Sequence, residues 1–353
     1  MPAVSEKGYI EKKIDKPYSE VRTGGYTYFA ENDILLAKIT PCMENGKCAI
    51  ATGLTNGIGF GSSEFHVLRC TKKILNLYLF ALLNTQEVRR VAEKNMTGSS
   101  GHRRVPASFY ANMEIPLPPL DVQKEIADEC GKVDKEIKTK QSELSTLNHD
   151  VISTMNSLSY PTIRLSELCT QISNGLNIKQ SIVAKGLPIT RIETIATGTL
   201  DREKMGYGNL MSSAGKESYL LKNGDILMSH INSHKFVGKC ALVNDVADGE
   251  EIIHGMNLLR IRVNERVLPE YLYLYFLSDR FKTSIEPYIT DAVNQSSLNV
   301  TNLSSIEIPV PSMEVQRDIV SNLMYKLKQV NKCKVYIQSA DSLKQAALDK
   351  YLK

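Results

Sequence analysis

The chain has 353 residues, of which 42% are apolar, and this is enough to build two ordinary domains, each with its own core. With 43 basic and 39 acidic residues, its formal charge of +4 is so small that any nucleic-acid partner would have to be met by local patches. No apolar run is long enough for a signal peptide or a membrane helix, and the seven scattered cysteines form no CxxC pair. We therefore expect a cytoplasmic protein with reduced thiols and no metal site.

The first 120 residues are predicted to form an α/β domain. A helix is expected near 76–95, and the prolines of Ile115-Pro116-Leu117-Pro118 then favour an extended strand. Turn signals such as Asn45-Gly46 separate the earlier elements. These are three short strands, at residues 33–39, 47–51 and 65–68.

From residue 121 to about 158 the apolar residues follow a heptad pattern. Alternate spacings of four and three residues are typical of a coiled-coil seam. A helix of roughly 33 residues would be on the order of 50 Å long, so it would extend beyond an α/β unit of this size. The seam positions are Ile126, Cys130, Val133, Ile137, Lys140, Leu144, Leu147 and Val151.

The same order of elements returns about 193 residues further along the chain. The second copy is predicted to form an α/β domain at 159–313, with a helix at 269–288, and a second heptad helix at 314–353. Its three strands are expected at residues 225–231, 239–243 and 258–263. Its seam is Ile319, Leu323, Lys326, Val330, Cys333, Ile337, Ala340 and Lys344. Lysines interrupt the two seams at different layers, which predicts that the two helices pair with each other.

Each α/β unit leads into the pattern Pro-x-Pro-x-x-(Asp/Glu)-Val-Gln and a long helix, and copy one also carries Thr40-Pro41-Cys42-Met43-Glu44-Asn45-Gly46-Lys47. In this order the chain resembles, over nearly its whole length, the DNA specificity subunit of type I restriction-modification systems. The resemblance implies two target recognition domains, mixed α+β globules joined by long antiparallel coiled-coil helices. Each domain would read one half of a split site in double-stranded DNA. The resemblance also implies two modification (methyltransferase) subunits and further restriction subunits as partners, and no catalysis or cofactor in this chain.

Polar loops at matching places in the two copies are the candidate DNA contacts. Hydroxyls and amides suit phosphate oxygens or adenine edges, and arginine can donate to phosphate or guanine. Ordinary solvated turns and loop drift remain open as alternatives. The candidate residues are Lys38, Thr40, Lys47, Ser99, Ser100, His102, Arg103, Arg104, Lys179, Arg191, Ser229, His230, Asn232, His234, Lys235, Gln295, Ser296 and Asn299.

Parts of the sequence also fit three other functions. A DNA adenine methyltransferase is suggested faintly by Asp15-Lys16-Pro17-Tyr18, but the chain has no glycine-rich loop for a methyl donor and no room for the domain. A nuclease would rest on Glu44 and Lys47 near Asp33, although copy two has no acid at the place of Glu44. A coiled-coil scaffold without a nucleic-acid role would leave the repeated α/β domains unexplained.

Copy two opens with the segment Pro161-Thr162-Ile163-Arg164-Leu165, for which copy one has no counterpart, since Met1 aligns near Leu187. Roughly 26 residues of the repeated unit are therefore missing from copy one. On this comparison we expect the first domain to be incomplete and to read its half-site weakly or not at all.

Overall fold

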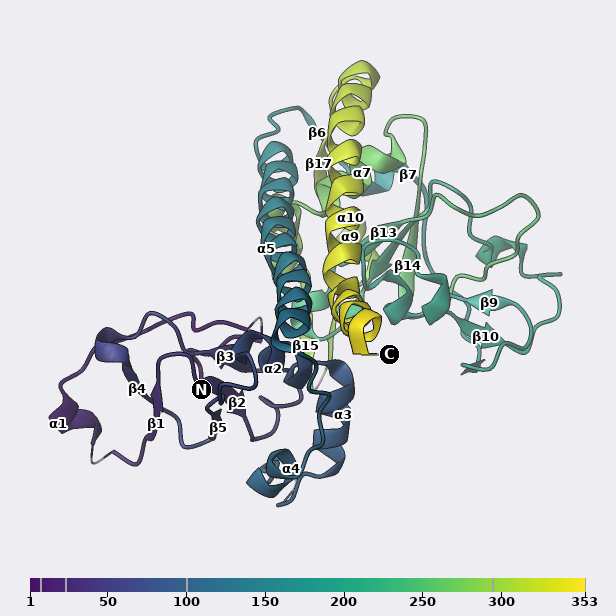
Figure 1. The fold of residues 1–353 in the computed structure, drawn as a ribbon. Helices are drawn as coiled ribbons and strands as arrows, with labels where there is room; N and C mark the ends of the chain where they lie inside the picture. The colour runs from purple at the N-terminus through teal and green to yellow at the C-terminus, as the bar shows by residue number, and fades with distance from the viewer. Residues whose placement is uncertain (7, 23, 100, 294, 353) are drawn as a thin grey trace. The chain divides into compact units, whose positions relative to one another are not determined.

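The computed structural model describes residues 1–353 apart from 7, 23, 100, 294 and 353 (Figure 1). The chain divides into unit 1, residues 1–142 with 333–353, and unit 2, residues 143–332. Each unit holds one α/β domain and one part of each long helix, α5 (Leu120–Asn156) and α10 (Met313–Leu352).

Unit 1 is built on an antiparallel sheet in the order β3-β2-β5. The central strand β2 (Ile34–Ala37) pairs with β3 (Cys48–Ile50) and β5 (Phe65–Leu68). All four β2 residues are buried, and they alternate between two apolar clusters, as the period of two in a strand requires. One of these clusters includes Phe29 and Phe65, and the other includes α2 (Asn76–Leu83).

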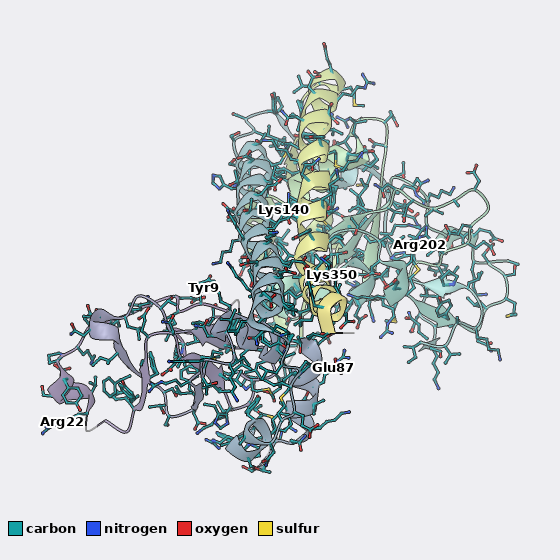
Figure 2. All side chains as sticks on the ribbon, viewed as in Figure 1. Tyr9, Arg22, Glu87, Lys140, Arg202 and Lys350 are labelled. Carbon is teal, nitrogen blue, oxygen red and sulfur yellow. The ribbon has the colours of Figure 1, made fainter. Side chains whose placement is uncertain are left out.

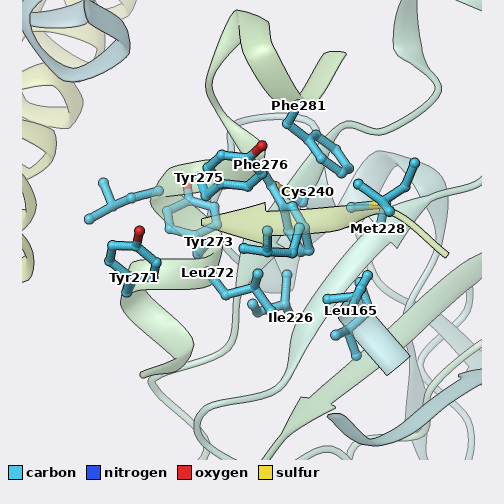
Figure 3. Packing of buried hydrophobic residues seen from close by; sticks show 14 of the residues in the cluster. Leu165, Ile226, Met228, Cys240, Tyr271, Leu272, Tyr273, Tyr275, Phe276 and Phe281 are labelled. Atoms are coloured by element: carbon cyan, nitrogen blue, oxygen red, sulfur yellow. The ribbon is translucent and has the colours of Figure 1, made fainter. Parts of the chain in front are cut away.

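Unit 2 repeats this sheet and extends it, in the order β13-β11-β14-β7. The repeated strands are β13 (Cys240–Leu242), β11 (Ile226–Ser229) and β14 (Leu258–Val263), and the added one is β7 (Cys169–Asn174). Figure 3 shows aromatic side chains of the following helices packed with Ile226, Met228 and Cys240. The described part of unit 1 has no strand at the place of β7.

The single helix expected at 76–95 and at 269–288 is wrong, because each of these spans holds two α-helices. They are α2 followed by α3 (Gln86–Lys94), and α7 (Pro269–Phe276) followed by α8 (Asp279–Ile285). The hydroxyl of Thr85 accepts from the backbone N–H of Val88, and that of Ser278 from Phe281. These N-caps start a new helix at equivalent places in the two copies.

The Ile-Pro-x-Pro strand is confirmed in unit 2 and wrong in unit 1. In unit 2, β17 (Glu307–Pro309) pairs with β6 (Thr162–Arg164). In unit 1, residues 115–118 form neither helix nor strand and pair with no strand in the described chain. The carbonyls of Pro116 and Pro118 accept instead from the side chains of Tyr78 and Gln123, so side chains take the place of a partner strand.

Shorter elements complete the fold. Unit 2 has a further small sheet in the order β8-β10-β9, which together with the neighbouring segments forms a lobe. In this lobe the Arg202 side chain (labelled in Figure 2) donates hydrogen bonds to Asp245 and Glu250. The remaining helices are α1 (Tyr18–Val21), α4 (Ala107–Ala111), α6 (Leu165–Leu168) and α9 (Val300–Ser304). The remaining strands are β1 (Thr27–Ala30), β4 (Ile58–Gly61), β8 (Gln180–Ser181), β9 (Pro188–Ile189), β10 (Gly206–Gly208), β12 (Ile231–Asn232), β15 (Thr290–Ala292) and β16 (Gln295–Ser297).

The long helices α5 and α10 pair with each other, as the lysines in the seams predicted, and run antiparallel, as the resemblance implied. In unit 1, Lys350 Nζ (labelled in Figure 2) lies 2.6 Å from Glu129 Oε1, and Lys344 pairs with Asp134. In unit 2, Lys326 Nζ lies 2.8 Å from Asp150 Oδ2. Every predicted seam position is buried or partly buried. The helix pairing is therefore confirmed within each unit.

The described helices include none that is both long and apolar enough to cross a membrane. All seven cysteines are free thiols. Within the described ranges, no group of three or more His, Cys, Asp or Glu side chains is placed to hold a metal ion.

Candidate nucleic-acid interface

In unit 1, two of the candidate segments meet where β2 ends. The carbonyl of Lys38 accepts from the Val105 N–H at 2.9 Å, and the Thr40 N–H donates to the Arg103 carbonyl at 3.0 Å. The backbone of Arg104 also forms isolated antiparallel β-bridges with Ile39 and with Thr97. The structure therefore places the strand end and the Thr97–Arg104 loop side by side.

Unit 2 has the same arrangement. Strand β12 pairs with β16, with Ile231 opposite Ser297, and the Leu298 N–H donates to the His230 carbonyl at 2.9 Å. The contacts correspond residue by residue. Ile39 and Arg104 of unit 1 correspond to Ile231 and Ser297 of unit 2, at offsets of 192 and 193 residues, and both pairs are in register. The pair Thr97 and Arg104 likewise corresponds to Thr290 and Ser297. We call 38–44 with 93–105 the loop surface of unit 1, and 230–236 with 286–298 the loop surface of unit 2.

The two arginines on the loop surface of unit 1 have different surroundings. Arg104 donates through Nε and Nη2 to both oxygens of Glu64 at 2.8–3.2 Å, and through Nη1 to the His102 carbonyl at 3.0 Å. The guanidinium of Arg104 holds the pKa of the Glu64 carboxyl below its usual value. Arg104 therefore holds the loop against Glu64, the residue that precedes β5.

Arg103 is held more loosely. Its Nη2 lies 3.7 Å from Glu44 Oε1 and 3.8 Å from Glu93 Oε1, and 39% of its side chain is exposed. Glu44 Oε1 also accepts from the Thr40 hydroxyl at 2.8 Å. Both contacts of Arg103 are longer than hydrogen bonds, so its donors remain available.

The other candidates of unit 1 lie around these arginines. His102 and Ser99 are exposed, and Lys38 and Lys47 are partly exposed. Lys47 precedes β3, where its carbonyl accepts from the Ala37 N–H at 3.0 Å. Ser100 lies outside the described residues.

On the loop surface of unit 2, His234 lies between two carboxylates. Its Nδ1 lies 2.8 Å from Asp291 Oδ1, and its Nε2 lies 2.8 Å from Glu286 Oε1. A neutral imidazole has one N–H, so two carboxylate partners favour the doubly protonated ring. Asp291, followed by Glu286, accordingly raises the pKa of His234. The Ser296 hydroxyl and then His234 lower the pKa of Asp291.

Three candidates of unit 2 lie beneath this surface. Ser229, His230 and Ser296 are buried. Burial lowers the pKa of His230, whose Nδ1 has no hydrogen-bond partner in the described part of the chain. His230 lines a pocket of about 270 Å³ with Asn174 and Asn299. The Ser229 hydroxyl accepts from the side chain of Asn232 at 3.1 Å, so Ser229 holds this partly exposed amide in place.

Exposed polar groups form the outer part of the loop surface in unit 2. Lys235 and Gln295 are exposed, and Lys235 Nζ lies 4.8 Å from the centre of the Phe236 ring. Asn232 is partly exposed. Asn299 lies just after this surface and caps α9, where its side chain accepts from the Asn302 N–H at 2.8 Å.

Two candidates, Lys179 and Arg191, belong to the lobe around β8, β9 and β10 instead. Arg191 lines an open pocket of about 400 Å³ with residues that include Gln180 and Asn257. If Lys179 and Arg191 contact DNA, they do so from this lobe and not from the loop surface of unit 2.

Apart from Glu44, the carboxylates on or beside the loop surfaces are not among the residues that the sequence indicated, because those candidates were hydrogen-bond donors. Glu93 and Glu286 are separated by the same 193 residues as the rest of their segment. This repeated acid was the available signal. Asp291 and Glu64 have no acid at the corresponding place in the other copy, so no repeat marks them.

The sequence profile of the family described as "Type I restriction modification DNA specificity domain" matches residues 9–149 and again 160–335. These two matches cover most of the chain. The chain therefore belongs to this family, with one member domain in each copy of the repeat.

Individual relatives agree with this assignment. The putative type I restriction enzyme MjaX specificity subunit of Methanocaldococcus jannaschii is 41% identical over 160 residues, 45% of this chain and 37% of that protein. The EcoAI specificity subunit of Escherichia coli is 46% identical over 129 residues, 36% of this chain and 22% of that protein. The chain thus spans well under half the length of these two relatives. The type I restriction-modification S subunit of M. genitalium, at 14% identity, has the same fold, with a TM-score of 0.56 over 100% of this chain and 91% of that one.

Proposed function

We propose that this protein is a non-catalytic DNA specificity subunit that reads a two-part site. One observation carries the proposal. The two loop surfaces share one backbone arrangement, but their exposed donors differ, with Arg103 and His102 in unit 1 and Lys235 and Gln295 in unit 2. Different donors on a repeated scaffold are what two readers of different base sequences need.

We further propose that the paired helices bind two modification subunits, which would carry out methyl transfer, and that restriction subunits join them. The relatives named above are specificity subunits of type I restriction enzymes, which supports these partners. We place the assembly in the cytoplasm, where bacterial and archaeal DNA lies.

The contacts of the acidic residues disfavour a nuclease. Both oxygens of Asp33 accept from Arg69, and the carboxylate is buried. Asp225 makes the same pair with Arg262 in the other copy, although that copy has no acid in place of Glu44. The Asp–Arg pair therefore occurs also in the copy that lacks the other acid of a nuclease site, which indicates that the pair has a structural role.

Methyl transfer to DNA tests the proposal. We expect the purified chain alone to transfer no methyl group, and the chain with the modification subunit from the same host to direct methylation to one sequence. Methyl transfer by the chain alone would make it a methyltransferase. Strand cleavage by the chain alone would make it a nuclease, and methylation of one sequence without the chain would leave it a scaffold.

A further inference from the structure

The neighbouring residues Arg103 and Arg104 differ in what they can still donate. Each of the three guanidinium nitrogens of Arg104 already donates to Glu64 or to the His102 carbonyl. Arg103 has no side-chain contact of hydrogen-bond length to the described residues, and its guanidinium is partly exposed. Arg104 is thus a positioning residue, whereas Arg103 offers its donors to a ligand.

The carboxylates beside Arg103 make a base edge a better ligand than a phosphate. Glu93, whose side chain is 50% exposed, and Glu44, 20% exposed, would repel an approaching phosphate anion. A neutral base edge meets no such repulsion. Guanine presents two acceptors, O6 and N7, in the geometry of the arginine fork, and its paired cytosine presents a donor, the N4 amino group.

We propose that Arg103 determines specificity for one G·C base pair in the major groove. Its guanidinium donates to O6 and N7 of guanine, and Glu93 accepts from N4 of the paired cytosine. This inference rests on the proposed function and names the residues that carry it in unit 1. It also assigns a reading role to the domain that the sequence comparison expected to read weakly, because the loop surface is assembled there as in unit 2.

Unit 2 provides an internal control. At the place of Arg103 it has Ser296, which is buried and donates to Asp291, and at the place of Glu44 it has Phe236. Glu286 keeps the place of Glu93 but lies against His234. The half-site read by unit 2 therefore depends on other groups, and its base preference should not respond to changes at Arg103.

The test is selection from a library of DNA duplexes with randomised bases. The full chain is combined with the modification subunit of its host, and the bound DNA is sequenced for the wild type, Arg103→Ala, Arg103→Gln and Arg104→Ala. Arg103→Ala should lose about 5- to 150-fold discrimination at one G·C position of one half-site. Arg103→Gln should move that position towards A·T, because glutamine pairs with the N6 and N7 of adenine. Arg104→Ala should weaken binding without changing the preferred base at any position.

The outcomes separate the inference from the proposed function. A uniform loss of binding in Arg103→Ala, with every base preference kept, would mean a phosphate contact or a structural role and would overturn the inference. Unchanged selection would overturn it as well. If the wild-type complex selects no sequence at all, the proposed function fails, and the inference fails with it. A shift to A·T in Arg103→Gln would support the inference even if Arg103→Ala proved unstable, because a structural role gives no new base preference.

Discussion

At the residue scale, each copy has one buried carboxylate paired with an arginine that lies in the neighbouring strand or directly after it. Asp33 accepts from Arg69 at 2.7 and 2.8 Å, and Asp225 accepts from Arg262 at the same two distances. Arg69 lowers the pKa of Asp33 by its hydrogen bonds. The aspartates were visible in the sequence as part of the repeat. Their partners were not, because the pairing depends on which strands lie side by side, and local periodicity does not specify this.

Removing this carboxylate charge in unit 2 should destabilise the unit. Asp225 is buried, so Asp225→Asn leaves Arg262 without its counter-ion, and we expect a loss of about 3 kcal/mol in the free energy of unfolding. Denaturant unfolding measures the change. Arg266→Ala is the matched control, because its contact with Glu167 is exposed and 4.0 Å long. Equal stability of the Asp225→Asn variant and this control would contradict the structural role.

The two carboxylates around His234 predict a pH dependence. Since they raise its pKa above the ordinary 6.5, the stabilisation should be complete below pH 6.5 and be lost as the pH rises through the raised value. Titration of the histidine ring signals by NMR measures this. Burial lowers the pKa of His254 to about 4, so the two rings should titrate on opposite sides of 6.5. A midpoint for His234 at or below 6.5 would show that the carboxylate contacts do not form in solution.

At the element scale, the Val-Gln motif at the start of each long helix has a structural role. The Gln316 side chain accepts from the Leu268 N–H at 2.8 Å and donates to the carbonyls of Arg266 and Pro311. Gln123 makes the corresponding bonds to Leu75, Lys73 and Pro118. The sequence identified the motif by its repetition. It could not identify the contacts, because most of them join residues about 50 positions apart.

Pairing of the long helices can be tested by exchanging charges. Lys326→Asp alone places two acids together at Asp150, and Asp150→Lys alone places two lysines together. Each should cost about 0.5–1 kcal/mol, because both side chains are partly exposed. The double variant should recover most of that loss in thermal unfolding. Additive losses would mean that the two helices do not meet at this layer in solution.

At the scale of the whole molecule, the repeat and the two helices could be predicted because they follow from periodicity. The loop surfaces could be placed only in outline. Their backbone contacts recur in both copies, but the carboxylates that decide which donors stay available differ between them, as Glu64 and Asp291 do. Side chains that differ between the two copies cannot be found by comparing the copies with each other.

Shortening the helix pair should shorten the unread gap between the two half-sites. Deleting seven residues from each helix, 139–145 from α5 and 332–338 from α10, keeps the heptad register in both helices. Seven residues correspond to about 10 Å of helix, or about three base pairs. Selection from randomised duplexes should return the same bases with a shorter gap. A change in the bases with an unchanged gap would mean that the helices do not set the spacing.

The most direct test is to map methylated adenines in the host genome with and without this gene. We expect one methylated motif to disappear when the gene is removed, and we expect this motif to consist of two short specified halves separated by unread bases. With Arg103→Ala in place of the wild type, one G·C position of one half should become unspecified. A motif that persists without the gene, or that is a single uninterrupted sequence, would contradict the claim that two units of this chain each read half of a divided site.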